Sequence, residues 1–269
     1  MAKHIIKVAS AAPAFSKDSV FVVASVSKGT KLSLVADNVD ISSLKNLDLE
    51  KLGAKATADS MIKVPGPNGS FFAIVGGFKA NEIDALRYVG GTIGRLLGDF
   101  RTVVSGLPVA SEAEALALLE GYSVGNYSYE AYKSEAKKPT TQTFVLATKT
   151  KVKPATLTRV EILRAAVHDT RDLVSMPAND LYPQSFAALA TKLSKGSAVT
   201  ITVLDEKKLA AGGFGGMLGV GKGSVRPPRL VKIDYRPTGA KKKIAFVGKG
   251  ITYDTGGLSL KPANSMLGM

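Results

Sequence analysis

Cysteine is absent from this chain of 269 residues, and histidine occurs only twice. A chain without cysteine forms neither a disulfide framework nor a thiolate zinc site, which is consistent with a reducing compartment. His4 and His168 lie far apart in the sequence, and two isolated histidines do not make a metal site. We expect His168, in a helix, to lie at the surface or between domains.

Long apolar runs are also missing. No stretch reaches the roughly 18 residues that a membrane span requires, so we expect no contact with a membrane. Residues 1–14 are similar to a secretory signal, but Lys7 interrupts an apolar core that is already too short. These observations predict a cytoplasmic protein.

Acidic residues are few: 22 Asp and Glu stand against 36 Lys and Arg, for a formal net charge of +14. Such an excess is typical of proteins that bind nucleic acid or anionic surfaces. The lysines are mostly scattered, however, with tight clusters such as Lys137-Lys138 and Lys241–Lys243, and aromatic residues are not interleaved with them. A solvated basic surface is the favoured interpretation, and nucleic-acid binding stays open as the less favoured one.

Strand-like and helix-like patterns alternate along the chain, which indicates an α/β fold class. We expect an N-terminal α/β domain at residues 1–150, a linker and long helix at 151–175, and a second α/β domain at 176–269. Gly90-Gly91 inside an expected helix predicts close packing there. The expected strands are 3–9, 20–26, 31–35, 61–64, 71–75, 101–107, 144–148, 198–204, 230–235 and 243–247, and the expected helices are 40–52, 81–97, 111–119, 157–173, 184–193 and 206–211.

The stretch VGKGITYDTGGLSLKP at residues 247–262 differs in character from the rest. It follows the expected strand 243–247 and contains four glycines, one carboxylate and two lysines, with too few apolar residues in period for a helix. A glycine-rich loop at the carboxyl end of a strand is where α/β proteins present their chemistry. Gly256-Gly257, just after Asp254, allows the backbone to approach a ligand or metal closely.

This stretch closely resembles the active-site segment of the leucine aminopeptidase (cytosol aminopeptidase) family of two-metal exopeptidases. The resemblance implies that Lys249 and Asp254 are metal ligands and that Lys261 is catalytic. It also implies the release of N-terminal residues, often leucine, from peptide substrates. Two divalent metal ions (Zn or Mn, with Mg as an alternative) and a homo-hexameric assembly are implied as well.

These roles make specific chemical demands. A lysine ligates a metal only as the neutral amine, so Lys249 needs burial and an adjacent dication to lose its proton. Asp254 supplies the hard oxygen ligand that suits Zn, Mn or Mg. Two metals about 3.5–4 Å apart can hold a bridging hydroxide and polarise the scissile carbonyl. Lys261, kept charged, would stabilise the oxyanion. Without the resemblance, a solvated Lys–Asp pair in a surface loop would be the simpler interpretation.

The resemblance extends to residues 175–183 and 212–235, and more weakly to 120–133. It assigns residues 176–269 to the metallopeptidase catalytic domain, incomplete because further metal-binding carboxylates and a catalytic arginine follow in the family. We therefore expect a fragment with little or no activity of its own. Met269 is a weak candidate for the wall of the substrate side-chain pocket.

Three alternatives remain. Residues 216–222 fit the phosphate-loop pattern G-x-x-x-x-G-K, but Gly223 stands where Ser or Thr should bind magnesium, and no strong strand leads into the loop, so nucleotide binding is not favoured. The other two are a DNA-binding regulator and a non-catalytic structural protein with the same fold.

Overall fold

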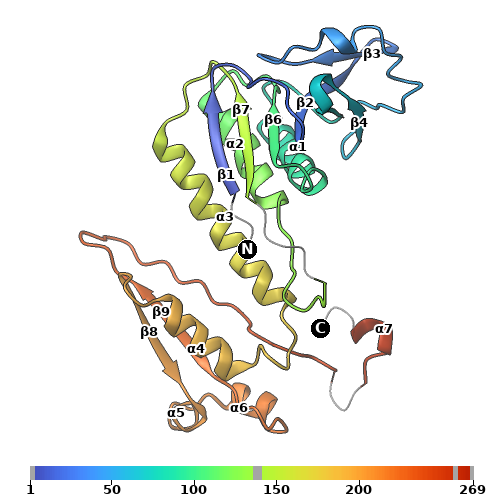
Figure 1. Ribbon diagram of the computed structural model, residues 1–269. Helices are drawn as coiled ribbons and strands as arrows, with labels where there is room; N and C mark the ends of the chain where they lie inside the picture. Colours follow the sequence, from blue (N-terminus) through green and yellow to red (C-terminus); the bar gives the residue numbers. More distant parts are fainter. Residues whose placement is uncertain (1–3, 136–140, 257–259, 267–269) are drawn as a thin grey trace. The chain divides into compact units, whose positions relative to one another are not determined.

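The computed structural model describes residues 4–135, 141–256 and 260–266. The chain divides into two compact units, Met1–Asp172 and Leu173–Met269, which are described separately below. Figure 1 shows the elements of both units in chain order. No described helix is long and apolar enough to cross a membrane.

A seven-stranded sheet forms the centre of the first unit, with the order β1-β7-β6-β2-β5-β4 and β3 paired to the far half of β2. The first five strands of that order are parallel, whereas β3 and β4 are antiparallel to their neighbours. Because β2 lies in the middle of the sheet, its first seven residues are all buried, and this explains why its sequence is a nearly continuous apolar run. The strands are β1 (His4–Ala9), β2 (Ser19–Lys28), β3 (Lys31–Val35), β4 (Met61–Pro65), β5 (Phe71–Val75), β6 (Thr102–Ser105) and β7 (Gln142–Ala147).

Two helices, α1 (Ile83–Leu96) and α2 (Glu112–Gly125), cover one face of this sheet (Figure 1). Their side chains join those of the strands in the larger apolar core, where Tyr122 stacks on Phe144 with ring centroids 3.9 Å apart. Ser111 caps α2 by accepting a hydrogen bond from the backbone N–H of Glu114 at 3.2 Å. The α/β fold class predicted from the alternating pattern is confirmed.

Glycines allow α1 and α2 to pack with their backbones in near contact. A Cβ placed on Gly90 would lie 2.3 Å from the carbonyl oxygen of Leu118, and one on Gly121 would lie 1.9 Å from that of Arg87. A Cβ on Gly91 would meet its nearest neighbour only at 3.8 Å. A Cβ on Gly125 would lie 2.3 Å from the carbonyl oxygen and 2.8 Å from the Cα of Gly91, so the close packing predicted for Gly90-Gly91 is confirmed at both residues.

The opposite face of the sheet is covered by irregular chain rather than by the helix predicted at 40–52, and that prediction is wrong. Only η1 (Ser42–Leu44) forms one short 3-10 turn there. Asn38 and Gly53 both have positive φ, which turns the backbone away from helical geometry at either end. Leu44 is buried against the second apolar core, so tertiary contacts and not helical periodicity place these residues.

The long helix α3 (Pro154–Ser175) follows β7, and its first turn is fixed by a carboxylate of α2. Glu112 Oε1 accepts hydrogen bonds from the Lys153 backbone N–H at 2.9 Å and the Thr156 hydroxyl at 2.5 Å. Chiefly through the Thr156 hydroxyl, these bonds lower the pKa of Glu112 to about 2.

The second unit holds the antiparallel pair β8 (Val199–Leu204) and β9 (Leu230–Tyr235), with register from Val199↔Tyr235 to Leu204↔Leu230. Its helices are α4 (Pro183–Leu193), α5 (Glu206–Ala211), α6 (Gly215–Gly221) and α7 (Ala263–Met266). Of its described hydrophobic residues only Ala187 and Leu209 are buried. This unit therefore contributes little apolar burial of its own.

Candidate active site

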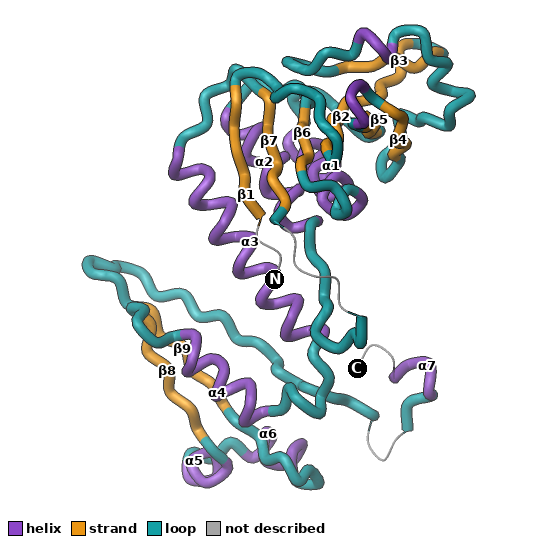
Figure 2. The backbone as a smooth tube through the Cα atoms, viewed as in Figure 1, coloured by secondary structure: helices purple, strands orange, loops and turns teal. Residues whose placement is uncertain are grey.

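The glycine-rich stretch begins in chain that has no regular structure. Residues 236–256 form neither helix nor strand, as Figure 2 shows, so the strand predicted at 243–247 is wrong for this structure. Phe246 is 95% exposed and Val247 98%. A strand needs a neighbour to pair its backbone groups, and β9 pairs only with β8 within the described residues. The apolar sequence of residues 243–247 favours a strand, but no described strand pairs with these residues.

Asp254 organises the loop that follows. Its Oδ1 accepts a hydrogen bond from the backbone N–H of Gly256 at 2.8 Å, and its Oδ2 lies 3.0 Å from Nζ of Lys261. The backbone N–H of Lys261 in turn donates to the carbonyl of Thr255 at 3.0 Å. Asp254 and Lys261, two of the four predicted site residues, are therefore brought together.

Gly256 is required in this turn for two reasons. Its φ is +75°, a conformation that other residues adopt with strain, and a Cβ there would lie 3.0 Å from Cγ of Lys261. The glycine thus leaves room for the lysine stem to cross the turn and reach Asp254. Gly257 lies outside the described residues.

The turn keeps the Asp254 carboxylate ionised. The hydrogen bond from Gly256 and then the ammonium of Lys261 lower the pKa of Asp254, and the positive charge of Lys249 adds to the effect. An ionised carboxylate is the form that binds a hard divalent cation. Asp254 is therefore suited to the ligand role predicted for it.

Among the predicted site residues that the structure describes, Lys249 has the least structural support for its role. It belongs to an exposed run of chain, whereas a metal-binding amine needs shelter from water to lose its proton. Its charge acts on Asp254, which is consistent with a common site but does not show one. The roles of Lys249, Asp254 and Lys261 stay predictions, and Met269 lies outside the described residues.

The donors present amount to part of a metal site. Within the described ranges, no group of three or more His, Cys, Asp or Glu side chains could hold a metal ion. Asp254 and a deprotonated Lys249 would supply two donors, fewer than the four to six that Zn or Mg takes. The chemistry of these two residues fits a divalent metal, but their number does not complete its coordination.

We expected His168 at the surface or between domains. It is not at the surface, so the first of these alternatives is wrong. It is 4% exposed inside the first unit, and its Nε2 lies 2.9 Å from the carbonyl oxygen of Ser123 near the end of α2. Its ring meets the Tyr127 ring edge-on, with centroids 5.2 Å apart. His168 therefore anchors α3 to α2, and burial lowers the pKa of the imidazole.

Arg226 is a residue of the second unit that the sequence patterns did not single out. Its guanidinium lies 4.1 Å from the centroid of the Tyr182 ring and donates hydrogen bonds to the carbonyls of Ala178 and Asn179, at 2.8 and 2.9 Å. These contacts join residues 178–182 to the chain before β9. The sequence signal that could have identified Arg226 is the Pro227-Pro228 pair that follows it. Two prolines stiffen the backbone and so restrict the direction of the Arg226 guanidinium.

The phosphate-loop pattern at 216–222 lies largely in α6, which no strand enters directly. A phosphate loop needs free backbone N–H groups between a strand and a helix. The local structure agrees with the sequence-based rejection of nucleotide binding.

Residues 168–269 match the model of the cytosol aminopeptidase family, catalytic domain. The chain is 40% identical over 227 residues to a probable cytosol aminopeptidase of Leifsonia xyli subsp. xyli, covering 82% of this chain and 46% of that protein. It is similar in structure to the bottromycin maturation enzyme BotP in complex with Mn, with a TM-score of 0.68 and 27% identity, covering 92% of this chain and 51% of that one. It shares the fold of a mutant tomato leucine aminopeptidase, with a TM-score of 0.74 and 18% identity, covering 94% and 55%. The chain spans about half the length of these proteins.

Proposed function

This chain belongs to the cytosol aminopeptidase family, and we propose on that premise that its loop at residues 247–262 serves the metal-dependent hydrolytic release of N-terminal residues, leucine-like ones in particular, from peptides. The observation that carries the proposal is the turn that holds Asp254 ionised against Lys261, inside the segment that matches the catalytic domain. The domain limits at residues 150 and 176 belong to the same proposal.

Each residue has one task in this proposal. Asp254 and Lys249 would hold the cation, which when bound supplies Lewis acidity and an activated water. Two divalent ions, Zn or Mn or else Mg, are proposed for the complete site. BotP, whose solved complex contains Mn, supports a divalent metal in this fold.

Lys261 would bind the substrate's carbonyl oxygen. Its ammonium is neutralised by Oδ2 of Asp254 in this structure. When that carboxylate oxygen is engaged as a ligand, the ammonium is released from its ion pair and can donate to the oxygen on which negative charge develops. The lysine stays charged throughout, so its contribution is electrostatic.

Metal binding is the direct test of Asp254. We expect Mn²⁺ titrated into the 269-residue chain to bind weakly, and Asp254→Asn to abolish the binding. Asp234→Asn is the matched control, because Asp234 lies on β9 and pairs with Lys232 at 3.0 Å. Equal Mn²⁺ binding by Asp254→Asn and the parent chain would remove Asp254 from the ligand set.

The described residues supply too few donors to complete a metal site, so we infer that residues 1–269 alone have little or no peptidase activity. Rapid turnover of a leucine anilide with added Mn²⁺ or Zn²⁺ would refute that inference. A chimera that joins residues 1–269 to the remainder of the Leifsonia xyli relative should be active, and Lys261→Gln in it should lower kcat by ~10²–10³. A folded, metal-loaded but inactive chimera would favour a non-catalytic structural role.

The cellular location and the oligomeric state are proposed on the same basis. We expect a cytoplasmic homo-hexamer that acts on peptides, and light scattering on the chimera measures its subunit number. DNA binding is the competing role of the basic surface; a steep loss of DNA affinity with salt would support it.

A further inference from the structure

A cleft of about 580 Å³ lies in the first unit, between β3 and residues 41–50, and none of its lining residues belongs to the loop that carries Asp254. We propose that it is a binding site for short unblocked peptides with apolar side chains. The inference is independent of the proposed function, because its ligand is identified from the cleft itself. A volume of this size suits a small organic ligand, since such sites commonly measure about 300–1,000 Å³.

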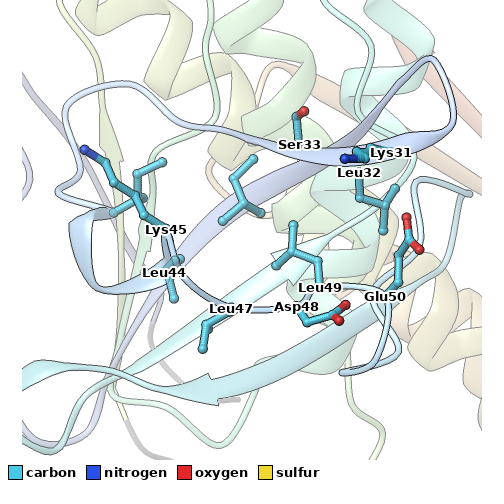
Figure 3. Close-up of a pocket in the computed structure, with 11 residues that line it drawn as sticks. Lys31, Leu32, Ser33, Leu44, Lys45, Leu47, Asp48, Leu49 and Glu50 are labelled. Carbon is cyan, nitrogen blue, oxygen red and sulfur yellow. The ribbon is translucent and has the colours of Figure 1, made fainter.

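The floor of the cleft is apolar. Leu32 and Leu34 of β3 face residues of the irregular segment, among them Leu44 and Leu49. Figure 3 shows Leu32 and Leu49 pointing toward one another across the middle of the cleft. Leu47 at the margin is 38% exposed, so apolar area remains that a ligand could cover.

The rim carries both signs of charge. Lys45 lies at one end of the cleft and Glu50 at the other, as Figure 3 shows, and Lys31 lies near Glu50. Within the described residues Lys45 and Glu50 form no ion pair, whereas Asp48 is already paired with Lys51 at 3.2 Å. The charge of Lys45 also acts on Asp40, but no described residue holds Lys45 or Glu50 in an ion pair, so both can still contact a ligand.

This arrangement selects a ligand with an ammonium at one end and a carboxylate at the other. A free amino acid carries both groups on one carbon, whereas a short peptide carries them at opposite ends of a chain that lengthens by about 3.3–3.6 Å per residue. Leucine-like side chains would then rest on the floor.

The exposed edge of β3 offers backbone groups to the same ligand. Lys28 and Lys31 close a two-residue hairpin, so the register turns the N–H and C=O groups of Leu32 and Leu34 away from β2. No described strand pairs with that edge. An extended peptide could pair there, as in other cases of strand addition.

Calorimetry with trileucine and the 269-residue chain tests the proposal, in EDTA so that no divalent metal supports hydrolysis. We expect saturable binding, weakened by about threefold to fivefold when the peptide is N-acetylated or C-amidated, because each change removes one exposed charge pair. Decanoate, which has one charge and an apolar tail, should bind more weakly than trileucine. No saturable binding, or decanoate binding as tight as trileucine, would overturn the proposal.

Charge-reversal variants locate the binding. Lys45→Glu and Glu50→Lys should each weaken trileucine binding by about threefold to fivefold, and Lys17→Glu, an exposed lysine outside the cleft, should not. In Glu50→Lys, N-acetylation should no longer weaken binding, and in Lys45→Glu amidation should no longer do so. Variants that keep native circular dichroism and bind like the parent chain would refute the site. Because no peptidase activity is measured, this result is separate from the fate of the metal site.

Discussion

The contact between α1 and α2 permits a sharp prediction, because adjacent glycines in one helix should respond to alanine in opposite directions. We expect Gly90→Ala to destabilise the first unit and Gly91→Ala to stabilise it. Alanine in place of a helical glycine contributes about 0.5–1 kcal/mol to stability wherever the methyl group has room. Gly91 has that room, since its added Cβ would be 3.8 Å from the nearest atom.

At Gly90 the added Cβ would lie 2.3 Å from the carbonyl oxygen of Leu118 and 2.8 Å from the backbone nitrogen of Tyr122. Both atoms belong to the backbone of α2, so no side chain can rotate away. The helices must separate by about 1 Å, which forfeits a quarter to a half of the dispersion energy of each contact they share. Overpacking of this kind typically costs about 1–3 kcal/mol, which exceeds the gain in helix propensity.

Urea denaturation followed by far-UV circular dichroism measures the difference. The midpoint should fall for Gly90→Ala and rise for Gly91→Ala, with equal slopes, if only stability changes. Near-UV dichroism, to which the buried Tyr122 contributes, would follow tertiary packing in the same samples. A Gly90→Ala chain as stable as Gly91→Ala would refute the backbone contact between the helices.

Glu112→Gln should lower stability near neutral pH, and the difference should vanish in acid. The folded-state pKa of about 2 lies below the ordinary value of 4.5, so the stabilisation is present above pH 4.5 and is lost as pH falls toward 2, which urea midpoints across that range measure. Arg226→Lys should speed hydrogen exchange around Tyr182, because an ammonium cannot both stack and donate as the guanidinium does; Arg236→Lys, at an exposed arginine, should not. Brief trypsin treatment should cut first at Lys241–Lys243, which are exposed and outside regular structure, and a first cut in the sheet of the first unit would contradict this.

Local patterns predicted most elements of the first unit because they depend on residues only a few positions apart. The continuous apolar run of β2 and the capped start of α2 at Ser111 both appear where the sequence indicates them. The expected strands 61–64 and 71–75 form β4 and β5, which pair across a turn at Pro67–Gly69 where Asn68 has a φ of 54°. The family was also identifiable from residues 247–262 alone.

The errors occur where distant contacts decide the outcome. Helical spacing at 40–52 was overridden because Leu44 packs against the sheet through irregular backbone. The apolar run at 243–247 forms no strand because no described strand pairs with it. His168 was expected at the surface or between domains, yet it is buried inside the first unit against Ser123, which lies 45 positions earlier in the chain.

The amino-acid sequence by itself determined the α/β class and the residues that carry the candidate chemistry. Only the tertiary structure decided that Asp254 is held by Gly256 and Lys261, and that Lys249 stands in exposed chain. The tertiary structure also creates the cleft beside β3, with leucines on its floor and charged residues on its rim, which no sequence motif predicts. The physical reason is range: propensity and turn chemistry act over a few residues, whereas burial and pairing depend on parts of the chain that meet only after folding.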